Sequence, residues 1–123
     1  MNGDKFLMVK QTRPTMYFWD LPGGRMEYEE TPEETVVREL KEETTLDVTP
    51  EKLLGVWWFL SPTNKNHMVC ITYLCKAKDL NVDITKNPEN DPINEFAWVT
   101  KDELLEGKYK ILNDSLKDII KSI

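Results

Sequence analysis

Three glutamates near the middle of the chain, Glu39, Glu42 and Glu43, could bind a divalent cation if the segment around them is helical. Their spacing of i, i+3 and i+4 places the three carboxylates on one face of a helix. Carboxylate oxygens are ligands that Mg²⁺ takes in proteins, together with waters and substrate phosphates. The alternative interpretation is an acidic helix face that is simply solvated, and the spacing alone does not decide between the two.

The three acids carry an energetic cost for the helix. Like charges at this spacing destabilise an isolated helix by roughly 0.2–0.5 kcal/mol per pair. Negative charge in the last turn also opposes the helix dipole, by about 0.3–1 kcal/mol at an exposed site. Arg38 precedes the first acid, Lys41 lies between the first two, and both can offset part of this cost.

The helix that carries these acids has a clear beginning in the sequence. Thr31 and Glu34 form a capping-box pattern, and Pro32 falls at the first helical position, where a missing N–H costs nothing. These signals predict a helix from Thr31 to about Thr44. At about 100° per residue, Val36, Val37 and Leu40 share one apolar face, and the glutamates occupy the neighbouring face.

Within Gly24–Leu46, eight residues follow a fixed spacing: Gly24, Glu30, Arg38, Glu39, Leu40, Glu42, Glu43 and Leu46. This pattern resembles the signature box of the Nudix hydrolases. One residue departs from the pattern: Thr45 stands where that box has glycine, at the end of the helix, so the helix end is in doubt while the acids are retained. The sequence "WDLPGG" (Trp19–Gly24) is also similar to the family's approach to the box.

The resemblance implies hydrolysis of a diphosphate linkage in a nucleoside diphosphate derivative, with Mg²⁺ or Mn²⁺ as the cofactor. It implies that Glu42 and Glu43 bind the metal and that Glu39 is a ligand or the general base. The backbone carbonyl of Gly23 is a further expected ligand, because a glycine pair lets the main chain approach closely. Arg38 is expected to orient the carboxylates through a bidentate contact with Glu30, which can also be wholly structural.

Other residues are weaker candidates for the same site. Glu95 is the first candidate for a downstream base or extra ligand, followed by Glu89 and Asp91, although an exposed acid in a loop is an equal alternative. The lone histidine, His67, is expected to be ordinary surface. Two pairs are candidates for substrate binding: Arg13 and Arg25 for phosphate, and either Trp57 or Trp58 for stacking on a base or sugar.

The remaining segments mix strands and helices without a regular repeat, which predicts a single α+β or α/β domain over residues 1–123. The resemblance implies a sandwich with a mixed β-sheet between helices. The sequence "NGD" at residues 2–4 is typical of a hairpin turn, so we expect a strand ahead of Met1 or an open edge along Lys5–Gln11. The other predicted elements are strands at Lys5–Gln11, Val56–Leu60, His67–Lys78 and Glu95–Val99, a loop over residues 12–24, and two C-terminal helices capped by Thr100 and Asn113.

Composition restricts the classes of function. The net charge of −6 argues against a general surface for nucleic-acid polymers, and no apolar run is long enough to span a membrane. Cys70 and Cys75 lie on opposite faces of a predicted strand, so we expect no disulfide between them and two reduced thiols. We expect a cytoplasmic protein that is a monomer or a homodimer. A nucleotide-binding module without turnover is the alternative function. Pro62 lies 16 residues beyond Leu46, a spacing that resembles that of ADP-ribose pyrophosphatases. Nucleoside triphosphates remain an equal alternative as substrates.

Overall fold

The computed structural model describes residues 1–87 and 92–123. No helix in this part of the chain is long and apolar enough to cross a membrane. The elements in chain order are β1 (Lys5–Thr12), β2 (Tyr17–Asp20), α1 (Pro32–Thr44), β3 (Val48–Leu60), β4 (His67–Ala77), β5 (Ile93–Thr100), α2 (Lys101–Leu105) and α3 (Ser115–Lys121).

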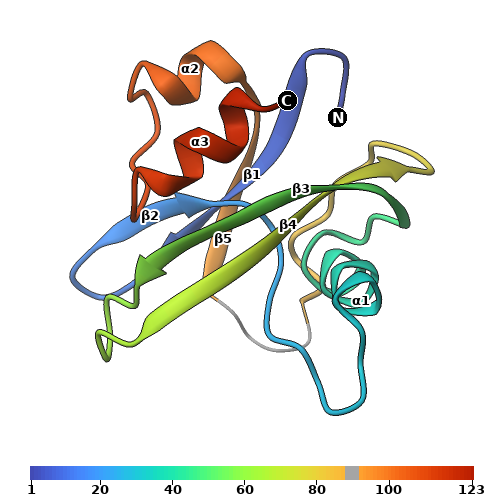
Figure 1. Ribbon diagram of the computed structural model, residues 1–123, viewed down its shortest axis with the longest axis horizontal. Coiled ribbons are helices and arrows are strands. Elements are labelled where there is room, and N and C mark those ends of the chain that lie inside the picture. The colour runs from blue at the N-terminus through green and yellow to red at the C-terminus, as the bar shows by residue number, and fades with distance from the viewer. Residues whose placement is uncertain (88–91) are drawn as a thin grey trace.

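The strands form two antiparallel sheets. One has three strands in the order β2-β1-β5, and the other is the long hairpin of β3 and β4. In Figure 1 the hairpin crosses over the three-stranded sheet, with α2 and α3 near one end and α1 on the other side. The predicted α+β class is confirmed, and the described strands pair antiparallel throughout rather than in one mixed sheet.

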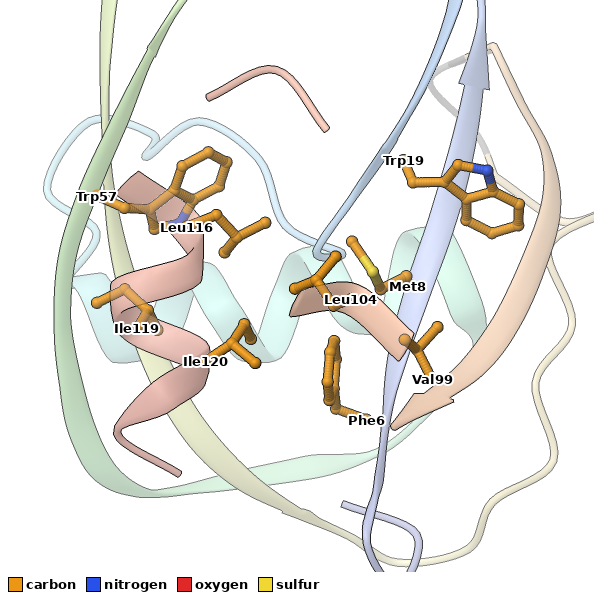
Figure 2. Packing of buried hydrophobic residues seen from close by; sticks show 9 residues of the cluster. All are labelled: Phe6, Met8, Trp19, Trp57, Val99, Leu104, Leu116, Ile119 and Ile120. Atoms are coloured by element: carbon orange, nitrogen blue, oxygen red, sulfur yellow. The ribbon is translucent and has the colours of Figure 1, made fainter. Parts of the chain in front are cut away.

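Apolar side chains from both sheets and from α2 and α3 form the core (Figure 2). Phe6 and Met8 are two residues apart on β1 and therefore point to the same face, where they meet Leu104 and Leu116 of the helices. Trp57 of β3 joins the same cluster. Helix α3 thus packs against residues of both sheets and joins them.

A pair of hydrogen bonds strengthens the junction between α3 and the hairpin. The backbone N–H of Trp58 donates to Ser115 Oγ over 3.0 Å, and that hydroxyl donates to the carbonyl of Trp58 over 2.7 Å. Asn113 was the predicted cap of α3, but the helix has Asp114 at its N-cap. The side chain of Asn113 still accepts from the N–H of Ser115 at 2.8 Å, so it satisfies a helix donor from one residue further out.

Two strands differ from the sequence prediction. The predicted loop over residues 12–24 contains β2, a strand too short for a clear alternation of side chains. Strand β3 begins at Val48 rather than Val56, and its register shifts between Pro50 and Lys52 and again between Leu53 and Gly55. Proline and glycine at such irregularities interrupt the strand signal without ending the strand.

The turn predicted from "NGD" is present. Asn2 and Lys5 exchange both backbone hydrogen bonds, at 2.7 and 3.0 Å, around Gly3 with a φ of 61°. Strand β5 pairs with β1 over Lys5–Gln11, whereas β2 pairs only with Val9–Thr12. The expected open edge is therefore found among the described strands only along Lys5–Met8, and a strand ahead of Met1 stays a prediction.

Thr45 ends α1 in the left-handed conformation, with a φ of 62°, and its N–H donates to the carbonyl of Lys41. This is the conformation in which the expected glycine is unstrained and a β-branched residue costs roughly 1–2 kcal/mol.

We predict that Thr45→Gly raises the melting temperature, because removing Cβ relieves the left-handed strain. The gain is reduced to about 1 kcal/mol or less by the greater freedom of glycine in the unfolded chain. Thr45→Ala is the matched control, since alanine keeps Cβ and should gain much less. This account would be contradicted if the melting temperature of Thr45→Gly were equal to or lower than that of Thr45→Ala.

Candidate active site

The capping box positions helix α1. The hydroxyl of Thr31 accepts from the N–H of Glu34 at 3.2 Å, and the Glu34 carboxylate accepts from the N–H of Thr31 at 3.1 Å. Pro32 is the first helical residue, as predicted. The register that follows turns Glu39 and Glu43 inward, where each is only 3% exposed, beside the buried Leu40.

This orientation corrects the expected apolar face of the helix. Val37 is 40% exposed, so it does not share the buried face with Leu40. The inward face of α1 instead includes two carboxylates. Because burial of an ionised carboxylate is costly unless charges or hydrogen bonds compensate it, the solvated interpretation does not fit Glu39 and Glu43.

The segment Gly23–Gly24 lies directly against these two carboxylates. The N–H of Gly23 donates to Glu43 Oε1 at 2.7 Å. A Cβ on Gly24 would lie 2.5 Å from both carboxylate oxygens of Glu39, closer than real Cβ contacts. A side chain at Gly24 would therefore force the Glu39 carboxylate to move, so glycine at this position lets the main chain approach that acid closely.

Arg38 supplies positive charge to the same group of acids. Its guanidinium contacts Glu30 in a bidentate manner, with Nε to Oε2 at 2.7 Å and Nη2 to Oε1 at 3.0 Å. Its Nη1 donates to Glu39 at 2.8 Å and to Glu42 at 3.2 Å. Nη2 also donates to the carbonyl of Arg25 at 2.8 Å, so one side chain joins the loop before α1 to the helix.

The pairing with Arg38 shifts the titration of its partner. Hydrogen bonds from Arg38 are the largest cause that lowers the pKa of Glu30 to about 2, helped by the N–H of Glu27 and the hydroxyl of Thr35. The hydrogen bonds to Glu30 also raise the pKa of Arg38 above its usual value. Both groups are therefore charged at any ordinary pH, and the expected contact between them is present.

The donor set suits a hard divalent cation. Glu39, Glu42 and Glu43 offer only oxygen atoms as ligands. Nη1 of Arg38 donates to both Glu39 and Glu42, so these two carboxylates lie close together. Within the described ranges, no three His, Cys, Asp or Glu side chains already converge on one point as metal ligands. The residues present fit Mg²⁺ by ligand chemistry.

A cavity of roughly 660 Å³ begins at Gly23 and Gly24 and extends between the two sheets. Its walls are mainly apolar and include Trp57 and Phe59 of β3. Such a space beside a few polar groups is typical of a small-molecule site. The sequence indicated only part of it, because residues from β1, β2 and the hairpin become neighbours only after the sheets pack.

Asp20, the last residue of β2, also lines this cavity, and the sequence analysis did not select it. Its Oδ1 accepts from the N–H of Leu21 at 2.8 Å. Burial raises the pKa of Asp20 to about 7, and the bond from Leu21 lowers it by less. Burial also raises the pKa of the Cys70 thiol to about 12, with a smaller contribution from the charge of Asp20.

Some of the predicted substrate residues lie at the cavity and others do not. Arg25 and the buried Trp57 line it. Trp58, the next residue on the strand, faces the opposite way, is 43% exposed and contacts the ring of His67 at 5.6 Å. Arg13 lies in the turn after β1, where it donates to Gln11 at 3.2 Å.

No hydrogen bond or ion pair joins Glu95, the first downstream candidate, to another acid in the described residues, and its ion-pair partner is a lysine. Glu95 lies on β5 opposite Lys10 and pairs with its ammonium at 3.5 Å. Glu89 and Asp91 lie outside the described residues. The expectation of free cysteines is met, since Cys70 and Cys75 are both unpaired thiols on β4.

Comparison with known proteins identifies the class. The family model of the NUDIX domain matches residues 1–121. A MutT-like protein of Streptomyces ambofaciens is 31% identical over 102 residues, which are 83% of this chain and 60% of that protein. Phosphatase NudJ of Escherichia coli K12 is 28% identical over 103 residues, or 84% of this chain and 65% of NudJ.

The fold agrees with this match. The crystal structure of a MutT protein from Methanosarcina mazei superimposes with a TM-score of 0.76 at 23% identity, covering 98% of this chain and 83% of that one. The chain therefore belongs to the Nudix family, and the resemblance seen in the box is confirmed. It spans 60–65% of the length of these two curated relatives.

We predict that Gly24→Ala destabilises the protein and displaces the Glu39 carboxylate, because the added Cβ would overlap it. An overlap of this kind costs on the order of 1–3 kcal/mol. The measurement is a double-mutant cycle of thermal or denaturant unfolding with Glu39→Ala, which removes the overlapping group. Gly24→Ala should cost much less in the Glu39→Ala background, and equal costs in both backgrounds would show that the approach of Gly24 to Glu39 is unimportant.

Proposed function

We propose that the protein is a pyrophosphohydrolase that uses Mg²⁺, or Mn²⁺, to cleave a diphosphate linkage in a nucleoside diphosphate derivative. The observation that carries this proposal is the burial of Glu39 and Glu43 against the Gly23–Gly24 segment, with Glu42 beside them. Membership of the Nudix family supports the same reaction class. The cytoplasmic location and the monomeric or dimeric state stay predictions.

Each residue of the cluster has a role in this proposal. Glu42 and Glu43 would hold the cation, with the carbonyl of Gly23 as a further ligand and Glu39 as ligand or general base. The cation, when bound, neutralises phosphate charge and lowers the pKa of a bound water for attack on phosphorus. Arg38 and Glu30 would fix the orientation of the carboxylates, since Arg38 is anchored to Glu30 by two hydrogen bonds.

The cavity supports a substrate with an organic group larger than the diphosphate. Arg25 lies at the end nearest the glutamates and would contact phosphate, while the apolar walls would receive the nucleoside part. One of the relatives is named a phosphatase, which agrees with phosphate release but defines no substrate. ADP-ribose-like compounds and nucleoside triphosphates are both retained as candidates.

The direct test is a panel of nucleoside triphosphates, dinucleoside polyphosphates and nucleoside diphosphate sugars with Mg²⁺ or Mn²⁺. We expect release of phosphate, pyrophosphate or a nucleoside monophosphate from at least one compound, and none in the presence of chelator. Metal-dependent binding of a compound without its turnover, by folded protein, would replace this proposal with the nucleotide-binding module.

We further predict that the order of stability of wild type and Glu43→Gln differs between a solution with chelator and a solution with Mg²⁺. Glutamine keeps an acceptor for the Gly23 N–H and removes a charge beside Glu39 and Glu42. The relieved i,i+4 repulsion from Glu39 contributes roughly 0.2–0.5 kcal/mol on a helix. With chelator the variant should melt at the same temperature as wild type or higher. With millimolar Mg²⁺ wild type should be the more stable, because only it gains the full binding energy.

Activity in Glu43→Gln should fall at least tenfold, as expected on loss of a metal-binding group. Glu51→Gln makes the same charge change at an exposed site on β3 and is the control for both measurements. Equal destabilisation of Glu43→Gln with and without Mg²⁺, together with full activity, would make Glu43 a structural residue.

A further inference from the structure

The buried face of α1 also carries the hydroxyl group of Thr35. This residue is 6% exposed and lies about one turn before Glu39, so Thr35, Glu39 and Glu43 follow one another at intervals of four residues on the inward face. Threonine is a poorer helix former than alanine or leucine, and its hydroxyl needs a hydrogen-bond partner when it is buried. The partners of this hydroxyl therefore indicate what Thr35 does in the fold.

The Thr35 hydroxyl has two acceptors within reach. Its Oγ1 lies 2.7 Å from Oε1 of Glu30 and 3.0 Å from the backbone carbonyl oxygen of Thr31, and a hydroxyl has one proton to donate. A bond to the carbonyl four residues earlier is an ordinary arrangement for threonine in a helix, and it would give Thr35 a local structural role only. The contact with Glu30 is shorter and its acceptor is charged, so the carboxylate is the stronger acceptor of the two.

The Glu30 carboxylate is held from both the helix and the preceding loop. Its Oε1 accepts from the N–H of Glu27 at 3.0 Å as well as from Thr35, and Arg38 donates to both of its oxygens, at 2.7 and 3.0 Å. These donors lower the pKa of Glu30 to about 2, with Arg38 as the largest cause. Glutamate and arginine both have flexible side chains, so the pair could move together. The bonds from Thr35 and Glu27 tie the carboxylate to one place.

The position of Glu30 determines where the guanidinium of Arg38 points. Nε and Nη2 donate to Glu30, and the third nitrogen, Nη1, donates to Glu39 at 2.8 Å and to Glu42 at 3.2 Å. The guanidinium is planar and rigid, so a displacement at its Glu30 edge also displaces Nη1. A change at Thr35 would therefore reach two of the carboxylates that are proposed to bind the cation.

We propose that Thr35 is a positioning residue for the metal site. Its hydroxyl fixes the Glu30 carboxylate and thereby the direction in which Arg38 donates to the acids of α1. This inference rests on the proposed function, which assigns the cation to those acids. Groups that hydrogen-bond directly to a metal ligand typically change metal affinity roughly ten- to hundredfold. Because Thr35 acts through two intervening side chains, we expect a smaller effect, of about fivefold.

The test separates the hydroxyl of Thr35 from its methyl group. Thr35→Val keeps the shape and removes the hydroxyl, whereas Thr35→Ser keeps the hydroxyl and removes the methyl. Mn²⁺ is titrated into each protein, and the free ion is measured by electron paramagnetic resonance without substrate or turnover. We expect Thr35→Val to bind Mn²⁺ about fivefold more weakly than wild type and Thr35→Ser to bind like wild type. Thr49→Val, the same change at an exposed site on β3, should also bind like wild type.

A second measurement needs no metal. The Nε–H of Arg38 donates to Glu30, so its exchange with water, followed by NMR, should be slow in wild type and in Thr35→Ser. The exchange should be severalfold faster in Thr35→Val. A residue needed only for packing would give the reverse order, because serine would then be the damaging change and valine the tolerated one.

Thermal melts check that each variant folds, and Thr35→Ala, which also lacks the hydroxyl, replaces Thr35→Val if valine is not tolerated. The role assigned to Thr35 is wrong if the variant without the hydroxyl binds Mn²⁺ like wild type, if Thr35→Ser binds as weakly as that variant, or if exchange at Arg38 does not change. Equal Mn²⁺ binding by wild type and all variants would overturn only the role of Thr35. No Mn²⁺ binding by folded wild type would overturn the proposed function and this role with it.

Discussion

The contact between the glycine pair and the buried carboxylates of α1 is the constraint on which the candidate site depends. Glu39 and Glu43 are held almost without solvent, and Gly24 leaves the space that the Glu39 carboxylate fills. A Cβ at that point would overlap the Glu39 carboxylate, which would have to move. The anchoring of Arg38 to Glu30 and to the carbonyl of Arg25 then fixes the loop along the helix.

The rest of the fold brings a cavity to this contact. Strand β2 leads into the glycine segment, so its last residue, Asp20, lines the same cavity as Gly23 and Gly24. The hairpin of β3 and β4 forms the opposite wall and is joined to the remaining structure through α3. The cavity and the acidic cluster are thus formed by different elements, and they adjoin at Gly23 and Gly24.

The sequence predicted the local features well because their rules are local. The capping box, Pro32 and the spacing of the glutamates all act within one or two helical turns, and the structure has the expected helix. The helix end, which Thr45 in place of the family's glycine had put in doubt, has the left-handed conformation. The family box added the contact between Arg38 and Glu30, which spans eight residues and could not be derived from helix periodicity.

What the sequence missed depends on packing between distant segments. The burial of Glu39 and Glu43 and the exposure of Val37 follow from what covers α1, which periodicity does not describe. The place of Asp20 in the cavity wall became evident only when β4 lay close to it. Trp57 and Trp58 could not be told apart until the register of the hairpin fixed which of them faces inward.

The pairing of one guanidinium with several acids also affects the order in which partners approach the site. In the described residues Arg38 contacts Glu27, Glu30, Glu39 and Glu42, so its single charge leaves the cluster strongly negative. A bare polyphosphate would be repelled from this surface, over a range of about 8 Å at physiological ionic strength. In the proposed reaction, the cation must therefore arrive first or enter already bound to the polyphosphate, and free polyphosphate in excess would compete for the cation rather than for the protein.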